Sequence, residues 1–403
     1  MPRGGLARAA WRFGPAFLVS VGYMDPGNWA TDIEGGARFG FSLLWVLLLS
    51  NAIALFLQAL ASKLGIVTGK SLAQNCRDRL PGWLNLLLWV AAEAAVLATD
   101  LAEFLGAALG FSLLLGVPLF EAAILTGVVV LALLGLERYG YRVVELAIIS
   151  LVAVVGVAYI VELAMIRPAL GPILRGLVEP DLSGGRLFLA IGILGATVMP
   201  HNLYLHSALV QARRPLLGER AHIASQHLDA AVALNAALLV NAAIMVTAAA
   251  TFHGRGPAVT SLAQAHAALV PLLGGLAAGA FAVALLASGL SSSTTAVMAS
   301  QVVLQGFLGV RVSLFVQRLL TMVPALVVIW IGVDSLKILI LSQVFLSFGL
   351  PFAVVPLVWL SQHRGVMGEF ASRRATTVIA SAVAALIALL NGLLICRLLA
   401  GAP

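Results

Sequence analysis

Charged side chains are scarce in this sequence. Asp, Glu, Lys and Arg together make up 10% of its residues, whereas hydrophobic residues make up 61%. Soluble domains carry roughly 25% charged residues, so a water-soluble fold is excluded. The apolar stretches repeatedly reach the ~20 residues that a helix needs to cross a bilayer, and they lack the short alternating segments of a transmembrane barrel. The sequence therefore predicts an all-α polytopic membrane protein.

Cysteines and enzymatic motifs are also scarce. Cys76 and Cys396 are the only cysteines, and the predicted topology places them on opposite sides of the membrane, so no disulfide within the chain is expected. Neither a His-Glu-x-x-His nor a Gly-x-Ser-x-Gly motif occurs, which argues against a membrane hydrolase. No pair of histidines faces across the predicted spans, so no haem or other resident cofactor is expected.

Hydropathy, punctuated by Gly, Pro and charged residues, predicts about eleven membrane spans and no soluble domain. The eighth window is too long for one crossing, so part of it is expected to extend beyond the hydrocarbon or to lie in the interface. The windows are 13–33, 41–62, 84–111, 113–135, 142–166, 187–211, 227–252, 268–307, 312–333, 337–361 and 374–398.

The basic residues predict the orientation. Most of the 24 Lys and Arg residues fall in segments that are cytoplasmic if the N-terminus is inside, so we expect a cytoplasmic N-terminus and an external C-terminus. The net charge of +7 is spread over short loops, which suits the headgroups of a lipid bilayer better than nucleic acid. The sequence thus predicts a multi-pass protein of the cell membrane with no obligatory protein partner.

Two of the predicted spans are interrupted by proline and polar residues. The first contains "MDPGNWATD" and the sixth contains "GATVMPHNLYLH", and Asp25-Pro26-Gly27-Asn28 aligns with Met199-Pro200-His201-Asn202. Paired breaks five helices apart indicate a transporter built from two inverted five-helix repeats, with a binding site near the midplane. The repeats would be 13–166 and 187–361 within a single domain, with 374–398 as an additional helix.

The residues at the breaks suit a metal cation. Pro26 and Pro200 free backbone carbonyls near Gly22 and Ala196, while Asp25 offers a carboxylate and Asn28 an amide oxygen. The thioether of Met199 adds a soft ligand that favours transition metals over Ca²⁺ and Mg²⁺. Two ordinary proline kinks and a packing methionine are the alternative interpretation.

Three acidic residues mark the third predicted span. Glu93, Asp100 and Glu103 fall within about 80° of one helix face, and acids in an apolar helix are typical of proton relays. The alternative is structural pairing, with Arg318 and His201 or His206 as partners, and the two interpretations are compatible.

Two further polar features are open to more than one interpretation. The run "SGLSSSTTAVMASQ" (288–301) is explained first by close helix packing, with a Na⁺ site as the alternative. Gln343 is an amide within the tenth span, where it could bind an ion or water or bridge two helices.

Five motifs together resemble the Nramp family of proton-coupled divalent-metal transporters: "DPGNWATDIEGGA", "ATDLAEFLGAALG", "GATVMPHNLYLHSALVQ", "LLASGLSSSTTA" and "LSQVFLSFGLPFA". The resemblance implies the LeuT-like fold of bacterial amino-acid/sodium symporters and alternating access for Mn²⁺ or Fe²⁺ entering with protons. It also implies that Cd²⁺ and Co²⁺ are carried. Many members have two adjacent basic residues where this chain has Gln317-Arg318.

The resemblance also implies roles for individual residues. The metal ligands would be Asp25, Asn28, Met199 and the carbonyls of Gly22 and Ala196, joined in some states by Gln343. Asp25 would also accept a proton, which Asp100 and Glu103 would pass to the cytoplasm while Glu93, His201 and Arg318 tune the path.

The sequence therefore predicts an importer of Mn²⁺ and Fe²⁺ coupled to protons, and not an enzyme. The first alternative is a Na⁺- or H⁺-coupled amino-acid symporter of the same fold, although Asp25 would repel a substrate carboxylate. A passive metal channel is the second alternative.

Overall fold

The structure is a computed structural model that describes residues 14–135, 154, 156–212, 218–254, 261–273 and 275–400. All regular secondary structure in these ranges is helical. The predicted all-α fold is therefore confirmed.

Eight helical segments of the described chain are long and apolar enough to cross a membrane, judged by length and composition. They are α4 (Leu44–Thr68), α6 (Gly82–Leu115), the pair α10 (Arg186–Thr197) and α11 (Pro200–Leu209), α12 (Glu219–Phe252), α14 (Gly275–Leu308), α15 (Leu314–Ile331), α16 (Ser335–Gln362) and α18 (Arg374–Leu399). The other three predicted spans correspond to the pair α2 (Pro15–Gly22) and α3 (Pro26–Phe39), to α7 (Leu119–Gly135) and to the short apolar helix Gly156–Ile166. Apart from residue 154, the rest of the predicted fifth span, 142–155, lies outside the described residues.

The eighth predicted window, 268–307, is corrected by the structure. It joins the end of a separate helix, α13 (Leu262–Leu273), to the long helix α14, which begins at Gly275. Glycine has the lowest helix propensity after proline, and the sequence has two consecutive glycines at 274–275, between the two apolar stretches. Hydropathy alone could not separate them because both helices are apolar.

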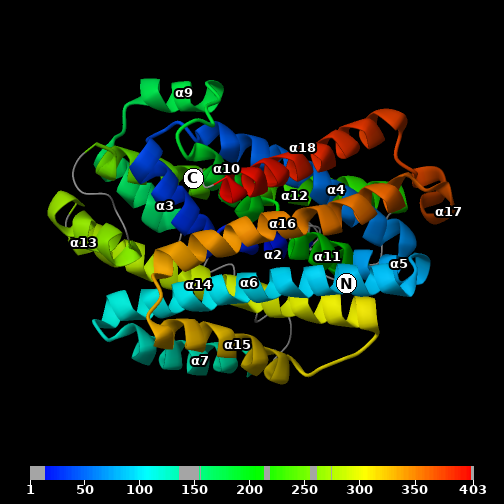
Figure 1. Cartoon of the computed structure of the whole chain (residues 1–403), viewed down its shortest axis with the longest axis horizontal. Helices are drawn as coiled ribbons and strands as arrows, with labels where there is room; N and C mark the ends of the chain where they lie inside the picture. Colours follow the sequence, from blue (N-terminus) through cyan, green and yellow to red (C-terminus); the bar gives the residue numbers. More distant parts are fainter. Residues whose placement is uncertain are drawn as a thin grey trace, which may run out of the picture.

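Short helices connect the spans, and the sequence analysis did not predict them. They are α5 (Leu72–Arg79), α9 (Leu170–Val178) and α17 (Arg364–Met367), with the 3₁₀ turns η2 (Val210–Ala212) and η3 (Gly368–Phe370). In Figure 1 the long helices run from side to side, with α5 and α17 at the right-hand end, α13 at the left-hand end and α9 at the upper left. This alternation is what successive membrane crossings produce.

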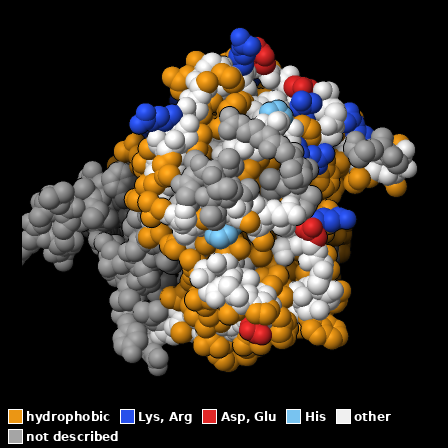
Figure 2. Space-filling view, turned by 90° about the vertical axis from the view of Figure 1, so that its left-hand side faces the viewer, with side chains coloured by type: hydrophobic (Ala, Val, Ile, Leu, Met, Phe, Trp, Pro, Cys, Tyr) orange, Lys and Arg blue, Asp and Glu red, His pale blue; other side chains and the backbone are white. Residues whose placement is uncertain are grey.

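The surface at the end with α9 and α13 is mixed in character. Figure 2 faces this end and shows Lys, Arg, Asp and Glu side chains among the apolar ones. Along the spans, by contrast, large apolar side chains face outward, and the most exposed include Trp83 at the start of α6 and Trp330 at the end of α15. Tryptophan is enriched where helices leave the hydrocarbon, so these positions fit the two ends of the spans.

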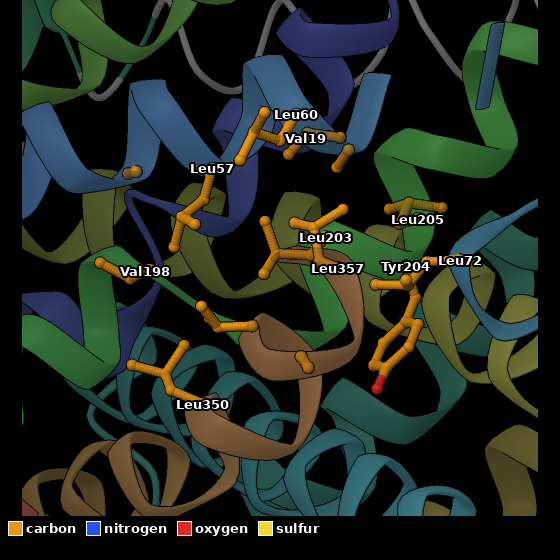
Figure 3. Close-up of a cluster of buried hydrophobic side chains, with 14 of the residues drawn as sticks. Val19, Leu57, Leu60, Leu72, Val198, Leu203, Tyr204, Leu205, Leu350 and Leu357 are labelled. Atoms are coloured by element: carbon orange, nitrogen blue, oxygen red, sulfur yellow. The ribbon is translucent and has the colours of Figure 1, made fainter. Parts of the chain in front are cut away.

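The helix breaks lie against a buried apolar cluster. Val19 of α2, Leu57 of α4, Leu203 of α11 and Leu357 of α16 belong to it, and Figure 3 shows their side chains converging between the four helices. All four residues are completely buried. Burial of these side chains holds both interrupted spans together, because each large apolar side chain contributes about 1.5–3 kcal/mol when fully buried.

Candidate metal site at the paired helix breaks

The structure confirms that both predicted spans are broken. In the first, α2 ends at Gly22 and α3 begins at Pro26; in the second, α10 ends at Thr197 and α11 begins at Pro200. A helical carbonyl normally accepts from the N–H four residues later, and proline has none. The carbonyls of Gly22 and Ala196 therefore lack their usual helical donors, as the sequence analysis expected.

Asp25 is the N-cap of α3. Its Oδ1 accepts a hydrogen bond of 2.7 Å from the Asn28 N–H, an arrangement for which aspartate is among the preferred residues. The residue is fully buried, and its second oxygen, Oδ2, has no hydrogen-bond partner. One oxygen thus holds the backbone while the other remains available to a cation.

Further oxygen donors surround Asp25. Oδ1 of Asn28 and Oε1 of Gln343 are buried without a hydrogen-bond partner, and Gln343 lies beside Asp25. A Cβ added at Gly27 would fall 1.6 Å from Nε2 of Gln343, and one added at Gly195 would fall 2.1 Å from the Gln343 carbonyl oxygen. Gln343 of α16 therefore packs against both breaks.

The side chain of Asn202 contacts both Met199 and the helix that precedes the first break. The sequence analysis did not name Asn202 as a ligand. Its Nδ2 lies 3.5 Å from the Met199 sulfur and 3.5 Å from the Val19 carbonyl, and its Oδ1 is buried without a partner. The alignment of Asn202 with Asn28 was the signal that could have identified it. Met199 itself is fully buried.

The remaining carbonyls of the first break are satisfied by side chains from three helices. Nδ2 of Asn241 in α12 donates to the Tyr23 carbonyl at 2.7 Å. Nε1 of Trp29 donates to the Met24 carbonyl at 3.2 Å, and the hydroxyl of Ser288 in α14 donates to the same oxygen. Ser288 thus supports the packing interpretation of the 288–301 run, whereas Asn241 was missed.

The candidate ligand set carries a single acid. Within the described residues, no three His, Cys, Asp or Glu side chains gather closely enough to hold a metal ion. Asp25 alone supplies formal charge, with neutral amide oxygens and the Met199 sulfur around it. Such a set leaves a dication only partly neutralised, which suits the reversible binding that transport needs.

Asp100 and Arg318 form a buried ion pair. Nη1 of Arg318 lies 2.8 Å from Oδ1 of Asp100, and both side chains are at most 1% exposed. Arg318 also donates to the hydroxyl of Ser293 in α14, and its guanidinium lies 5.9 Å from the ring centroid of Phe104. The pairing that the sequence analysis gave as an alternative is therefore present for Asp100.

Glu103 and Glu93 differ from Asp100 in their surroundings. Glu103 is fully buried, and neither carboxylate oxygen has a hydrogen-bond partner. It interacts electrostatically with Asp25 on one side and Asp100 on the other. Glu93 accepts a hydrogen bond of 3.4 Å from the Ser300 hydroxyl. The acidic face of α6 thus connects the first break to the ion pair.

The two histidines of α11 lie in different places. Nδ1 of His201 is 3.3 Å from the Thr99 hydroxyl of α6, beside Asp100 in sequence. His206 instead pairs with Gln58 of α4 at 2.8 Å, and the Gln58 amide donates to the Tyr23 hydroxyl at 2.8 Å. His201 therefore adjoins the acidic face of α6, and His206 hydrogen-bonds with α4 instead.

Comparisons with known proteins show the family of the chain. A family model described as natural resistance-associated macrophage protein-like (Nramp) matches residues 16–397. The divalent metal cation transporter MntH of Deinococcus radiodurans is 48% identical, over 99% of this chain and 92% of its own. The crystal structure of the manganese transporter of Eremococcus coleocola has a TM-score of 0.87 at 33% identity, covering 97% of this chain and 87% of that one.

A more distant likeness concerns the fold alone. Mhp1, a transporter of the nucleobase-cation-symport-1 family, has a TM-score of 0.63 at 16% identity, over 91% of this chain and 81% of its own. The predicted LeuT-like architecture and the predicted family are both confirmed. This chain therefore belongs to the Nramp family and is a membrane transporter rather than an enzyme.

Proposed function

We propose that this chain imports divalent transition-metal ions, with Mn²⁺ and Fe²⁺ as its leading substrates and Cd²⁺ and Co²⁺ also carried, in symport with protons. One observation carries the proposal: Oδ2 of Asp25 and Oδ1 of Asn28 are buried without hydrogen-bond partners at a helix break that Asn202 joins to the Met199 sulfur. The names of the relatives, a divalent metal cation transporter and a manganese transporter, support the same substrate class.

Binding would use donors of three spans, the two interrupted ones and α16. Asp25 Oδ2, Asn28 and Gln343 supply oxygens, the Gly22 and Ala196 carbonyls add backbone oxygens, and Met199 supplies sulfur. Sulfur binds borderline and soft ions in preference to Ca²⁺ and Mg²⁺. Because Asp25, Asn28, Met199 and Gln343 are all at most 1% exposed, the ion would be enclosed from both sides, as alternating access requires at one stage of the cycle.

Proton coupling would follow from competition at Asp25. A dication and a proton need the same carboxylate oxygen, so binding of the metal displaces the proton. Glu103 is the candidate acceptor on the α6 side, since its carboxylate oxygens have no hydrogen-bond partner and it interacts with both Asp25 and Asp100. Asp100 and Glu93 would carry the proton onward along α6 to the cytoplasm, with Arg318 and His201 tuning the path.

Uptake into proteoliposomes tests the proposal. We expect Mn²⁺ to enter faster under an inward proton gradient and to accumulate above its external concentration. Asp25→Ala should abolish this uptake, whereas Glu121→Gln, which removes an exposed acid at the start of α7, should not. Uptake that only equilibrates Mn²⁺ would identify a passive channel, and normal uptake by Asp25→Ala would refute the site.

A further inference from the structure

Three buried polar residues lie beyond the metal site and have no role in the proposed transport step. Asp32 of α3, with Tyr159 and Glu162 of the helix Gly156–Ile166, are each at most 2% exposed. Oδ2 of Asp32, the hydroxyl of Tyr159 and both carboxylate oxygens of Glu162 have no hydrogen-bond partner. Among the described residues, neither carboxylate forms an ion pair with Lys, Arg or His.

These three residues lie together. The hydroxyl of Tyr159 interacts electrostatically with both Glu162 and Asp32, so both acids lie near it. The Tyr159 ring packs edge-on against Trp29 of α3, with 5.0 Å between ring centroids, and Trp29 in turn donates to the Met24 carbonyl at the first break. The cluster is therefore connected to the metal site through one aromatic contact.

Asp32 of the cluster lies farther along α3 than the first break. Figure 1 shows α3 running from the centre toward the end that carries α9 and α13, the end predicted to be external. Asp32 follows Asp25 by seven residues, or about 10 Å along a helix. An ion entering from that end and moving toward Asp25 passes along this half of α3.

The charges of the cluster are not balanced by protein groups. A single acid within a bilayer-spanning helix costs ~2.5–3.5 kcal/mol on insertion scales, and here two acids share one buried environment. Asp100 has the same burial but is paired with Arg318. A dication would balance both carboxylates of the cluster and supply the contacts that their oxygens and the Tyr159 hydroxyl lack.

We propose that Asp32, Tyr159 and Glu162 form a second, transient site for a divalent metal cation on the external route to Asp25. The donors are all oxygens, which suits a partly hydrated Mn²⁺ that has not yet met the Met199 sulfur. Asp32 also interacts electrostatically with Asp25, so an ion at one position repels an ion at the other and the sites fill in turn. This inference rests on the proposed metal transport.

Kinetics provide the first test, using Mn²⁺ uptake by the full chain in proteoliposomes. Asp32→Asn and Glu162→Gln should each raise KM for Mn²⁺ by about tenfold, the lower end of the effect of a charged cleft on cation entry, while leaving the maximal rate unchanged. Glu34→Gln is the matched control, because it removes a partly buried acid of the same helix whose ion-pair partner is the exposed Arg38. Unchanged KM in both variants, or an equal rise in the control, would overturn the second site.

Binding provides the second test and separates the two sites. In Asp25→Asn, which disables the metal site, electron paramagnetic resonance should still detect one weakly bound Mn²⁺ per detergent-purified chain. The double variant Asp25→Asn/Glu162→Gln should lose that ion. If Asp25→Asn alone binds no Mn²⁺, the second site is refuted while the proposed function stands. If wild-type protein fails to transport Mn²⁺, the proposed function itself fails.

Discussion

At the scale of the residue, Asp25 shows how one side chain can serve both the fold and the substrate. Its Oδ1 caps α3 through the Asn28 N–H, and its Oδ2 is buried and unpartnered. A capping bond of this kind contributes about 1 kcal/mol, so the fold itself keeps the carboxylate at the break. The free oxygen is then already oriented before any ion arrives, which lowers the ordering cost of binding.

Met199 is expected to set metal selectivity. Replacing it by alanine removes the soft ligand and leaves oxygens, which Ca²⁺ and Mg²⁺ also accept. Met199→Ala should therefore retain part of its Mn²⁺ uptake while Ca²⁺ competes about tenfold better, a change of roughly 1.4 kcal/mol in relative binding. Competition assays in proteoliposomes measure this directly. Met298→Ala, at a partly buried methionine of α14, is the control, and unchanged Ca²⁺ competition in Met199→Ala would show that sulfur is not the filter.

The Asp100–Arg318 pair is expected to affect both the thermal stability of the protein and the coupling of Mn²⁺ uptake to protons, and two variants separate the two effects. Arg318→Gln leaves Asp100 buried without its partner, which typically costs about 3–5 kcal/mol, whereas removing both charges costs much less. Thermal unfolding in detergent should show a large loss for Arg318→Gln and substantial recovery in Asp100→Asn/Arg318→Gln. The double variant should nevertheless lose the effect of a proton gradient on Mn²⁺ uptake.

Arg311→Gln is the control for this pair, since Arg311 lies exposed between α14 and α15. Equal destabilisation of the single and double variants would mean that the ion pair is not the source of the effect. A double variant that is stable and still responds to the proton gradient would remove Asp100 and Arg318 from the proton route.

At the scale of the element, each break is held by the helices around it. Pro26 and Pro200 interrupt the backbone hydrogen bonds, and Asn241, Trp29 and Ser288 satisfy the carbonyls of Tyr23 and Met24. Irregular backbone at membrane depth is tolerated only where protein or a polar cavity surrounds it. The first break is therefore a property of α3, α12 and α14 together.

Close approach of α6 to the first break is a testable part of this arrangement. A Cβ at Gly106 would fall 2.1 Å from Cβ of Pro26, whereas one at Gly82 of the same helix would meet nothing within 4 Å. Alanine normally stabilises a helix by up to about 1 kcal/mol relative to glycine. We expect Gly106→Ala to lower both thermal stability and Mn²⁺ uptake because α6 or α3 must shift, and Gly82→Ala to do neither. Normal uptake by Gly106→Ala would mean that the helices can separate without affecting the site.

At the scale of the whole molecule, acidic groups follow one another through the interior. Neighbouring members interact electrostatically from the helix Gly156–Ile166 through α3 to α6, in the order Glu162, Tyr159, Asp32, Asp25, Glu103, Asp100 and Glu93. In the proposed transport cycle, Asp25 would divide this series into a cation side and a proton side. Such an arrangement lets the two ions reach the same carboxylate from opposite directions, which is the essential requirement of the proposed symport.

Sequence patterns predicted the features that depend on local chemistry. The breaks followed from Pro26 and Pro200, and the spans followed from hydropathy, because both signals lie within a few consecutive residues. The contact of Asn241 with the Tyr23 carbonyl and the position proposed for Glu162 could not be predicted, since each depends on which helix lies opposite. The short helix α5 has a local sequence signal, the capping box of Ser71 and Gln74. Hydropathy did not reveal this helix because it is short and polar.

The predicted orientation in the membrane can be tested by cysteine labelling. Burial raises the pKa of the Cys76 thiol of α5 to about 12, so this thiol remains protonated and unreactive toward maleimides at neutral pH. Only Cys396 then needs replacement by serine. In that background, an impermeant maleimide should label Glu179→Cys, after α9, on intact cells, and should label Glu369→Cys, in η3, only after permeabilisation. Both positions are exposed, and the reverse pattern would show that the N-terminus is external and that the proposed import runs in the opposite direction.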